Sequence, residues 1–193
     1  MRIVGGRFRG RTIAAPPDMR IRPTGDRVRE SLFNVLSHNG FGRGFALEGL
    51  RVIDLFAGTG ALGLEAISRG AAFCLFVDDH PESRALIREN VESLNLTGVT
   101  KIWRRDAGAL GPRAGNAPER FALAFMDPPY RKGLVNAALA GLRDGQWLAP
   151  GAIAVAETAA DEDAPQAEGF ILLDERLFGE TRVSILGAGE GPG

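Results

Sequence analysis

The sequence predicts an α/β fold in which a doubly wound, mostly parallel sheet carries helices on both faces. Three observations predict it. Apolar runs typical of strands alternate with helical segments from residue 51 onwards. Arg51–Phe56 is an apolar run broken only by Asp54, as expected for a central parallel strand. Two further strand candidates, 170–174 and 182–186, close the pattern, which favours a single layered domain.

Each element has its own local signal. Apolar residues recur at helical spacing between residues 26 and 36, and a second helix of about ten residues ends at Gly70. A third helix, 81–94, begins with a proline in its first turn. The remaining expected helix covers 134–142. The other expected strands cover 73–77, 100–104, 121–126 and 152–156.

The N-terminal segment is predicted to be a basic hairpin or arm outside the core. Two short strand candidates, Arg2–Val4 and Arg11–Ala14, flank a glycine-rich turn. We therefore divide the chain into an arm at 1–24, one domain at 25–187 and a flexible tail at 188–193.

The formal net charge of −1 hides a strong asymmetry. Residues 1–43 hold nine arginines against three acidic residues, whereas residues 144–193 hold ten acidic residues against two arginines. Clustered arginines displace counterions from phosphates, so the basic arm favours a nucleic-acid partner. A solvated face rich in arginine is the alternative. The RNA-binding candidates are Arg7, Arg9, Arg11, Arg22 and Arg27.

The composition excludes several classes of protein. Hydrophobic residues make up 45% of the chain without any run long enough to span a membrane, and the N-terminus lacks the apolar core of a signal peptide. We expect a cytoplasmic protein that is monomeric and has no membrane partner. The single cysteine, Cys74, excludes a disulfide framework and a cysteine-based zinc site, and we expect no metal.

A glycine-rich motif follows the first central strand. Gly58, Gly60 and Gly63 satisfy the G-x-G-x-x-G pattern between a strand and a helix, where backbone can approach a bound nucleotide closely. This pattern alone does not separate a nicotinamide cofactor from S-adenosylmethionine. The cofactor-binding candidates here are Asp54, Phe56, Ala57, Gly58 and Gly60.

Acidic residues follow the next two expected strands. Asp78 or the adjacent Asp79 would accept hydrogen bonds from ribose hydroxyls, and the sequence leaves both open. Asp106 would receive the amino group of adenine, with Ala107 beside it. Three carboxylates at one sheet edge favour a nucleoside pocket. Thr24, which either caps the first helix or contacts the cofactor, completes the candidates.

The motif Asp127-Pro128-Pro129-Tyr130 follows the fourth expected strand, at the same sheet edge. An amine on a purine ring is a weak nucleophile because its lone pair is delocalised. The Asp127 carboxylate and the Pro128 carbonyl are acceptors held by rigid proline φ angles, and they would orient such a nitrogen towards a methyl donor. Tyr130 can stack on an extruded base. The four residues are therefore the catalytic candidates.

Several motifs occur in the order found in one known family: Arg7–Arg11, Ile21–Thr24, Asp26–Asn34, Asp54–Gly63, Ser68–Ala71, Asp127–Tyr130 and Phe178–Val183. Together they resemble the RsmD type of bacterial 16S rRNA guanine-N2 methyltransferase over essentially the whole chain. Two departures stand out: Gly25 replaces a usual threonine, and Asp78-Asp79-His80 replaces the commoner glutamate at the second strand end.

The resemblance implies a Rossmann-like class I methyltransferase with a seven-stranded sheet. It implies S-adenosylmethionine as donor, with S-adenosylhomocysteine as product, and N2 of one guanine in 16S rRNA, position 966, as acceptor. The substrate would be an assembling or assembled small ribosomal subunit gripped by the basic arm.

Other functions fit parts of the sequence. The same donor could serve adenine N6 in DNA or RNA, or a glutamine amide in a protein. A nicotinamide-dependent dehydrogenase would use the glycine loop but leave Asp127–Tyr130 without a role. A non-catalytic RNA-binding assembly factor is a further alternative, and an intact Asp127 argues against it.

Overall fold

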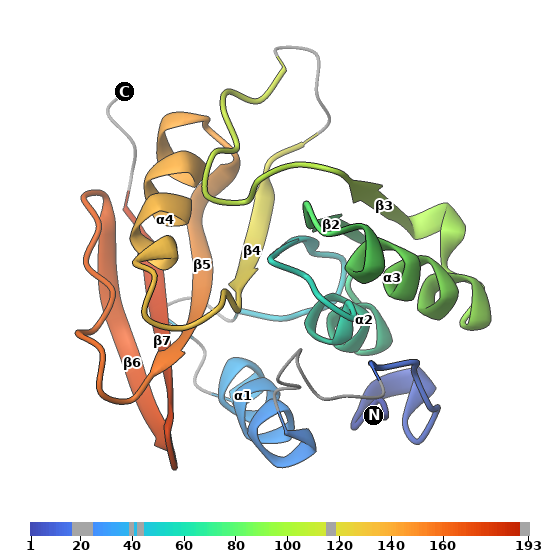
Figure 1. Ribbon diagram of the computed structural model, residues 1–193. Coiled ribbons are helices and arrows are strands. Elements are labelled where there is room, and N and C mark those ends of the chain that lie inside the picture. The colour runs from blue at the N-terminus through green and yellow to red at the C-terminus, as the bar shows by residue number, and fades with distance from the viewer. Residues whose placement is uncertain (17–24, 39–40, 42–44, 115–118, 190–193) are drawn as a thin grey trace.

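The chain forms one seven-stranded sheet with the strand order β3-β2-β1-β4-β5-β7-β6 (Figure 1). This is a computed structural model, and it describes residues 1–16, 25–38, 41, 45–114 and 119–189. The strands β1 to β5 run parallel, while β7 is antiparallel to β5 and β6 is antiparallel to β7. The predicted α/β fold with a mostly parallel seven-stranded sheet is confirmed.

The strands are Arg51–Leu55 (β1), Phe73–Val77 (β2), Thr100–Trp103 (β3), Phe121–Met126 (β4), Leu148–Ala159 (β5), Phe170–Phe178 (β6) and Thr181–Ala188 (β7). The α-helices are Asp26–His38 (α1), Ala61–Ser68 (α2), Pro81–Ser93 (α3) and Leu134–Asp144 (α4). Short 3₁₀ turns form at Gly6–Phe8 and Thr97–Val99.

Alternating residues of the central strands build two cores, one on each face of the sheet. Val52 and Phe125 point into a core shared with α1, α2 and α3, in which Phe33 of α1 packs on Phe125 at 5.5 Å between ring centroids. Ile53 and Ala124 point the other way, into a core shared with α4. The two layers of helices therefore cover opposite faces, as a doubly wound sheet requires.

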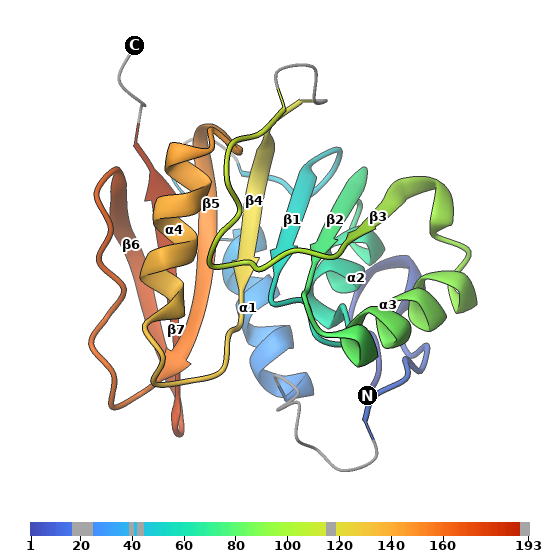
Figure 2. The ribbon, with the colours of Figure 1, turned by 45° about the horizontal axis from the view of Figure 1, so that its top comes forward.

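The carboxyl ends of the parallel strands lie at one edge of the sheet, at the bottom of the view in Figure 2. Leu55, at the end of β1, pairs with Val77 of β2 and with Met126 of β4, and Val77 pairs with Trp103 of β3. The segments that follow these four strands therefore meet at a single edge, where open α/β sheets bind ligands.

Three strands extend beyond the predicted ranges, and β7 does so by only one residue at its start and two at its end. β5 already begins at Leu148, and its first residues include Pro150 and Gly151. A strand accepts these two residues at an irregularity, and here the register between β5 and β4 shifts. β6 continues through charged residues to Phe178 and turns at Gly179, whose φ is 61°, into β7. Charged side chains suit an edge strand, since they discourage pairing with other chains.

The N-terminal arm differs from its prediction. The two expected strands reduce to one antiparallel bridge between Arg2 and Thr12, with a 3₁₀ turn between them. The expectation that this segment lies outside the core is wrong, because Ile3 and Ile13 are buried in the same core as α1 and α2. The alternation of apolar with charged residues concealed these two anchors.

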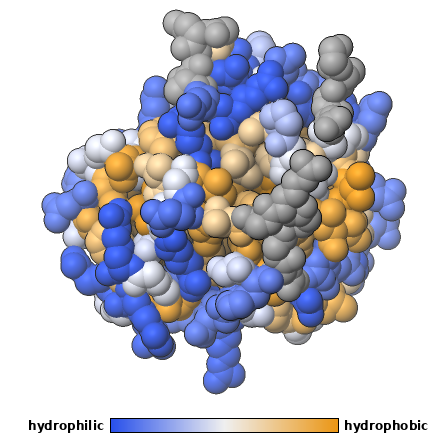
Figure 3. Space-filling view, turned by 180° about the vertical axis from the view of Figure 1, so that it is seen from behind, coloured by the Kyte–Doolittle hydropathy of each residue, from blue (hydrophilic) through white to orange (hydrophobic). Residues whose placement is uncertain are grey.

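The surface combines charged and apolar regions. Seen from behind, hydrophobic side chains gather across the middle of the molecule, with hydrophilic ones above and below (Figure 3). The large hydrophobic residues that are exposed within the described chain all belong to β6: Ile171, Leu172, Leu173 and Leu177. They lie on the edge strand farthest from β1.

Candidate active site

The glycine loop turns sharply between β1 and α2. Phe56, Gly58 and Gly60 have φ values of 56°, 57° and 78°, so the chain passes three times through the left-handed region. A hydrogen bond of 2.7 Å from the Gly60 amide to the Ala57 carbonyl closes the turn. Glycine adopts such angles without steric cost, whereas Phe56 is a non-glycine exception of the kind that clusters at functional sites.

Asp54 braces this loop from within the core. It is 1% exposed, and its Oδ2 accepts a hydrogen bond of 2.9 Å from the Gly63 amide. Burial raises the pKa of Asp54 to about 8, although the bond from Gly63 acts in the opposite direction. The structure therefore places Asp54 as a support for the loop backbone.

Gly63, the third glycine of the motif, serves helix packing. A Cβ atom at this position would lie 2.5 Å from the Cys74 sulfur and closer still to the Phe76 ring, both on β2. α2 can therefore lie against β2 only because residue 63 has no side chain. This is the packing role of the third glycine in a dinucleotide-type loop.

The structure distinguishes Asp78 from Asp79 at the end of β2. Asp78 is buried, and its two carboxylate oxygens accept hydrogen bonds from the amides of Gly58 at 2.9 Å and His80 at 2.8 Å. Asp79 is exposed. Asp78 thus ties the glycine loop to the second strand.

Asp106 and Ala107 follow β3 at the same edge. Asp106 is exposed and accepts a bond of 2.8 Å from the Gly108 amide, whereas Ala107 is 3% exposed. Both residues therefore leave the sheet at the edge that carries the glycine loop, two strands away from it. Thr24 and Arg22, the remaining candidates of their groups, lie outside the described residues.

The loop after β4 brings the catalytic candidates next to the glycine loop. Because Leu55 pairs with Met126, the residues that follow, Phe56 and Asp127, leave adjacent strands at the same level. Asp127 is half-buried, Pro128 is buried and Pro129 is exposed. A small pocket of about 50 Å³ lies beside this loop, lined in part by both prolines and by Thr158.

Tyr130 is fastened at its hydroxyl. The hydroxyl donates a hydrogen bond of 2.6 Å to Glu157 of β5 and lies 3.0 Å from the Thr181 hydroxyl of β7. Burial, followed by the bond to Glu157, raises the pKa of Tyr130 above its usual value. The side chain is therefore a neutral aromatic ring held by the sheet. Sequence reasoning missed Glu157 and Thr181, because strand patterns give no signal for contacts with a distant loop.

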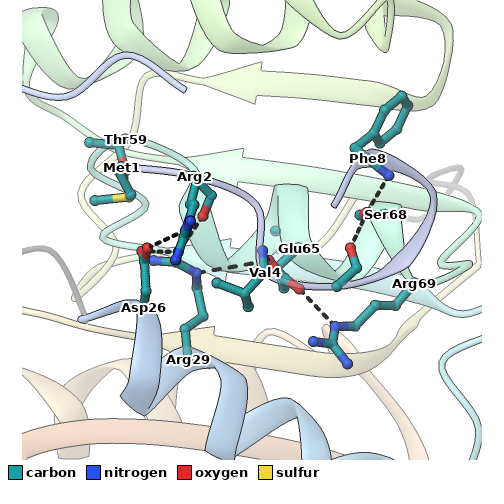
Figure 4. A network of polar contacts seen from close by, with 12 residues as sticks. Met1, Arg2, Val4, Phe8, Asp26, Arg29, Thr59, Glu65, Ser68 and Arg69 are labelled. Carbon is teal, nitrogen blue, oxygen red and sulfur yellow. Dashed lines mark hydrogen bonds and ion pairs between the residues drawn. The ribbon is translucent and has the colours of Figure 1, made fainter. Parts of the chain in front are cut away.

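A buried ionic network joins the arm to α2 (Figure 4). Glu65 of α2 accepts bonds from the Val4 amide at 2.9 Å and from Arg69 at 2.8 Å, and Arg29 of α1 lies 3.9 Å away. The side chains of Glu65 and Arg29 are fully buried. In the sequence, Arg29 is one of the nine arginines of the basic N-terminal region, and nothing there indicates that it is buried.

Asn90 of α3 makes a second connection between the arm and the glycine loop. Its side-chain amide donates to the carbonyls of Ala14 at 3.1 Å and Thr59 at 2.9 Å, and its oxygen accepts from the Ala14 amide at 2.6 Å. The arm is thus attached to both helices, α2 and α3, that follow the predicted cofactor-binding segments.

The arm presents its cations to solvent. Arg7, Arg9 and Arg11 are exposed, and so is Arg27 on α1. Arg11 also donates to the Ser93 carbonyl at 3.1 Å, and Arg7 lies over the Phe8 ring at 4.8 Å. These four arginines are available to phosphates. Over the described ranges, the helices are all too short or too polar to cross a membrane.

Comparisons with known proteins agree with this arrangement. The family described as conserved hypothetical protein 95 matches residues 1–187. The ribosomal RNA small subunit methyltransferase D of Escherichia coli K12 is 36% identical over 187 residues, which cover 96% of this chain and 88% of that protein. Its namesake from Haemophilus influenzae is 31% identical over 180 residues, covering 93% and 89%.

Solved structures give the same result. The structure of yhhF from Escherichia coli has a TM-score of 0.81 at 28% identity and covers 98% of both chains. A hypothetical protein from Thermus thermophilus has a TM-score of 0.73 at 32% identity, covering 96% of this chain and 98% of its own. The chain therefore belongs to the RsmD family of methyltransferases, as the order of its motifs predicts.

Proposed function

We propose that the chain is an S-adenosylmethionine-dependent rRNA methyltransferase that modifies N2 of one guanine in 16S rRNA, the guanine numbered 966. The observation that carries the proposal is the adjacency of two loops. The glycine loop follows β1 and Asp127–Tyr130 follows β4, and these strands are paired neighbours. A methyl donor in the first loop would lie beside an amine held by the second.

The residues at this edge fit S-adenosylmethionine. Gly58 and Gly60 would let the loop backbone approach the donor closely. Each oxygen of Asp78 accepts one backbone bond and can accept another, which suits the ribose hydroxyls. Asp106 and Ala107 would border the adenine. When bound, the donor supplies an electrophilic methyl group on its sulfonium.

The chain's own contribution to catalysis is positioning. The two N–H bonds of the guanine amine would be donated to the Asp127 carboxylate and the Pro128 carbonyl. This arrangement turns the nitrogen lone pair towards the methyl carbon and polarises the amine, so that an in-line displacement needs little reorganisation. Tyr130 would stack on the extruded base.

The substrate assignment rests on the family and on charge. Relatives of similar length are small-subunit rRNA methyltransferases. Exposed arginines on the arm would contact phosphates next to the site. We propose that the substrate is an assembling or assembled small subunit, and that the enzyme acts as a cytoplasmic monomer.

Nucleoside mass spectrometry of 16S rRNA tests the proposal. RNA from a strain that lacks this protein should have lost one N2-methylguanosine at a single position, and expression of the protein should restore it. Unchanged guanine methylation, or loss of N6-methyladenosine instead, would reject the assignment. Calorimetry should detect binding of S-adenosylhomocysteine but not of NAD, which excludes the dehydrogenase alternative.

A further inference from the structure

The C-terminal segment Phe178–Val183 supplies none of the residues assigned above to donor, amine or RNA. It forms the turn between β6 and β7 and the start of β7. In Figure 2 the chain that leaves β4 passes the carboxyl end of β5 before it enters α4. This path brings Tyr130 to the first residue of β7, Thr181.

Two buried groups hold the Tyr130 hydroxyl. Glu157 and Thr181 are 6% and 5% exposed. A phenol can donate one hydrogen bond and accept another, and here it donates to the Glu157 carboxylate and shares a bond with the Thr181 hydroxyl. A bond to a carboxylate is stronger than one between neutral groups. The far end of the ring is therefore fixed, which selects one rotamer about χ1.

The strands that carry these groups are themselves tied together. The Ala160 amide donates to the Glu180 carbonyl at 2.9 Å, and Arg182 donates to the Ala160 carbonyl at 2.9 Å. Arg182 also pairs with Glu175 of β6 at 2.9 Å. These bonds fix the start of β7 against the end of β5. Thr181 thus occupies a defined position relative to Glu157.

A second ion pair of this loop, at the surface, is weaker. Arg131 pairs with Asp161 at 2.9 Å, but both side chains are 66% exposed. Exposed pairs contribute little, because water and salt screen them and long side chains lose entropy. The buried bonds of Tyr130 therefore dominate the placement of the ring.

We propose that Glu157 and Thr181 are positioning residues, which hold the Tyr130 ring in the orientation required for stacking on the target base. The inference rests on the function proposed above. Fixing the ring before the substrate arrives lowers the entropy lost on stacking. The segment Phe178–Val183 then has a role in the active site through Thr181.

Thr181→Val tests this role, because valine keeps the shape and removes the hydroxyl. We expect kcat/KM for purified small subunits to fall about 10-fold, which corresponds to about 1.4 kcal/mol. The affinity for S-adenosylhomocysteine should stay within about twofold of that of the wild type. Thr181→Ser, which keeps the hydroxyl, should restore most of the activity. Glu157→Gln, which keeps an acceptor, should lose less than Glu157→Ala.

A double-mutant cycle separates positioning from general stability. Because both changes break one contact, Tyr130→Phe combined with Thr181→Val should be little worse than Tyr130→Phe alone. The control is Ser184→Ala on the same strand, where the hydroxyl is buried and has no hydrogen-bond partner among the described residues. It should leave kcat/KM unchanged.

The outcomes are distinguishable. A wild-type protein that transfers no methyl group to guanine N2 would overturn the proposed function and this inference with it. If the wild type is active, three results would overturn this inference alone. These are full activity of Thr181→Val, an equal loss of activity in Thr181→Ser and Thr181→Val, or a double variant whose loss of kcat/KM is the product of the two single losses. The inference would also be overturned if Thr181→Val lost affinity for S-adenosylhomocysteine by the same factor as it lost kcat/KM.

Discussion

Asp54 and Asp127 are carboxylates at the ends of adjacent strands, and their surroundings give them different roles. Asp54 is buried beneath the glycine loop and bonded to the Gly63 amide, whereas Asp127 is half-buried on the loop that follows β4. The first supports backbone, and we propose that the second accepts a hydrogen bond from a substrate amine. Sequence position alone made both site candidates, since a strand-end carboxylate has the same local pattern whether it is buried or partly exposed.

Asp127→Ala should abolish methyl transfer, because the amine loses its charged acceptor. The loss should be at least about 100-fold in kcat, the scale of a removed electrostatic group in an active site. The glycine loop is untouched, so S-adenosylhomocysteine should bind as before. Single-turnover assays and calorimetry measure the two effects. Asp144→Ala, at an exposed helix end, is the matched control. Retained turnover in Asp127→Ala would refute the role.

Asp54 makes stability depend on pH. Its folded-state pKa of about 8 lies above the ordinary aspartate value of 3.8, so the folded protein keeps a proton that the unfolded chain releases. The contribution of Asp54 to the free energy of unfolding is therefore largest below about pH 4 and falls as pH rises towards 8.

In the variant Asp54→Asn, the side chain cannot ionise but still offers an oxygen acceptor to the Gly63 amide. When the pH is raised from 5 to 8, the free energy of unfolding should fall less in the variant than in the wild type. The difference between the two falls should exceed about 1.4 kcal/mol, the equivalent of one pKa unit. Urea unfolding at the two pH values measures this difference. Equal pH dependence in the two proteins would show that Asp54 is already ionised in the fold.

At the scale of elements, the arm and α2 form one unit. Val4 of the arm, Arg29 of α1 and Arg69, which follows α2, converge on the buried carboxylate of Glu65. From residue 26 onwards the sequence predicted the helices and strands correctly in kind, because apolar period and glycine position are local signals. It could not predict this network, since Arg29 and Glu65 are distant in sequence and a buried arginine looks like a solvated one.

Glu65→Ala should destabilise the fold by about 1–3 kcal/mol, because the Val4 amide and Arg69 lose their buried acceptor, although Arg29 keeps its ion pair with Asp26 at 2.8 Å. The loss should be measurable as a lower urea midpoint. Glu89→Ala, an exposed acid on α3, should change stability by less than about 0.5 kcal/mol. Similar midpoints for the two variants would contradict the structural role of the network.

At the scale of the whole molecule, the sheet separates charge. The basic arm lies against α2 and α3, whereas the acidic C-terminal segment 144–193 contains β5, β6 and β7. Composition predicted this division, and topology explains it, because β3 and β6 are the opposite edges of the sheet. The sequence could not place the arm beside the glycine loop, since Asn90 makes that connection from a separate helix.

The arm's arginines should contribute to RNA binding through phosphate contacts. Arg7→Ala and Arg9→Ala should each weaken binding to small subunits and lower the slope of log affinity against log salt by up to about 1. Filter binding at several salt concentrations measures this. The control is Arg120→Ala. Arg120 is exposed and lies at the amino end of β4, away from the loops that follow the parallel strands, so this variant should leave the slope unchanged. An unchanged slope in the arm variants would place the RNA elsewhere.

The most direct test of the central claim is the identity of the methylated nucleoside. Purified small subunits from a strain lacking this protein would be incubated with the enzyme and S-adenosylmethionine carrying a labelled methyl group. Mass spectrometry of the digested 16S rRNA should find the label in N2-methylguanosine, at one position, and in no product made with Asp127→Ala. Label in N6-methyladenosine, or in several guanines, would contradict the account.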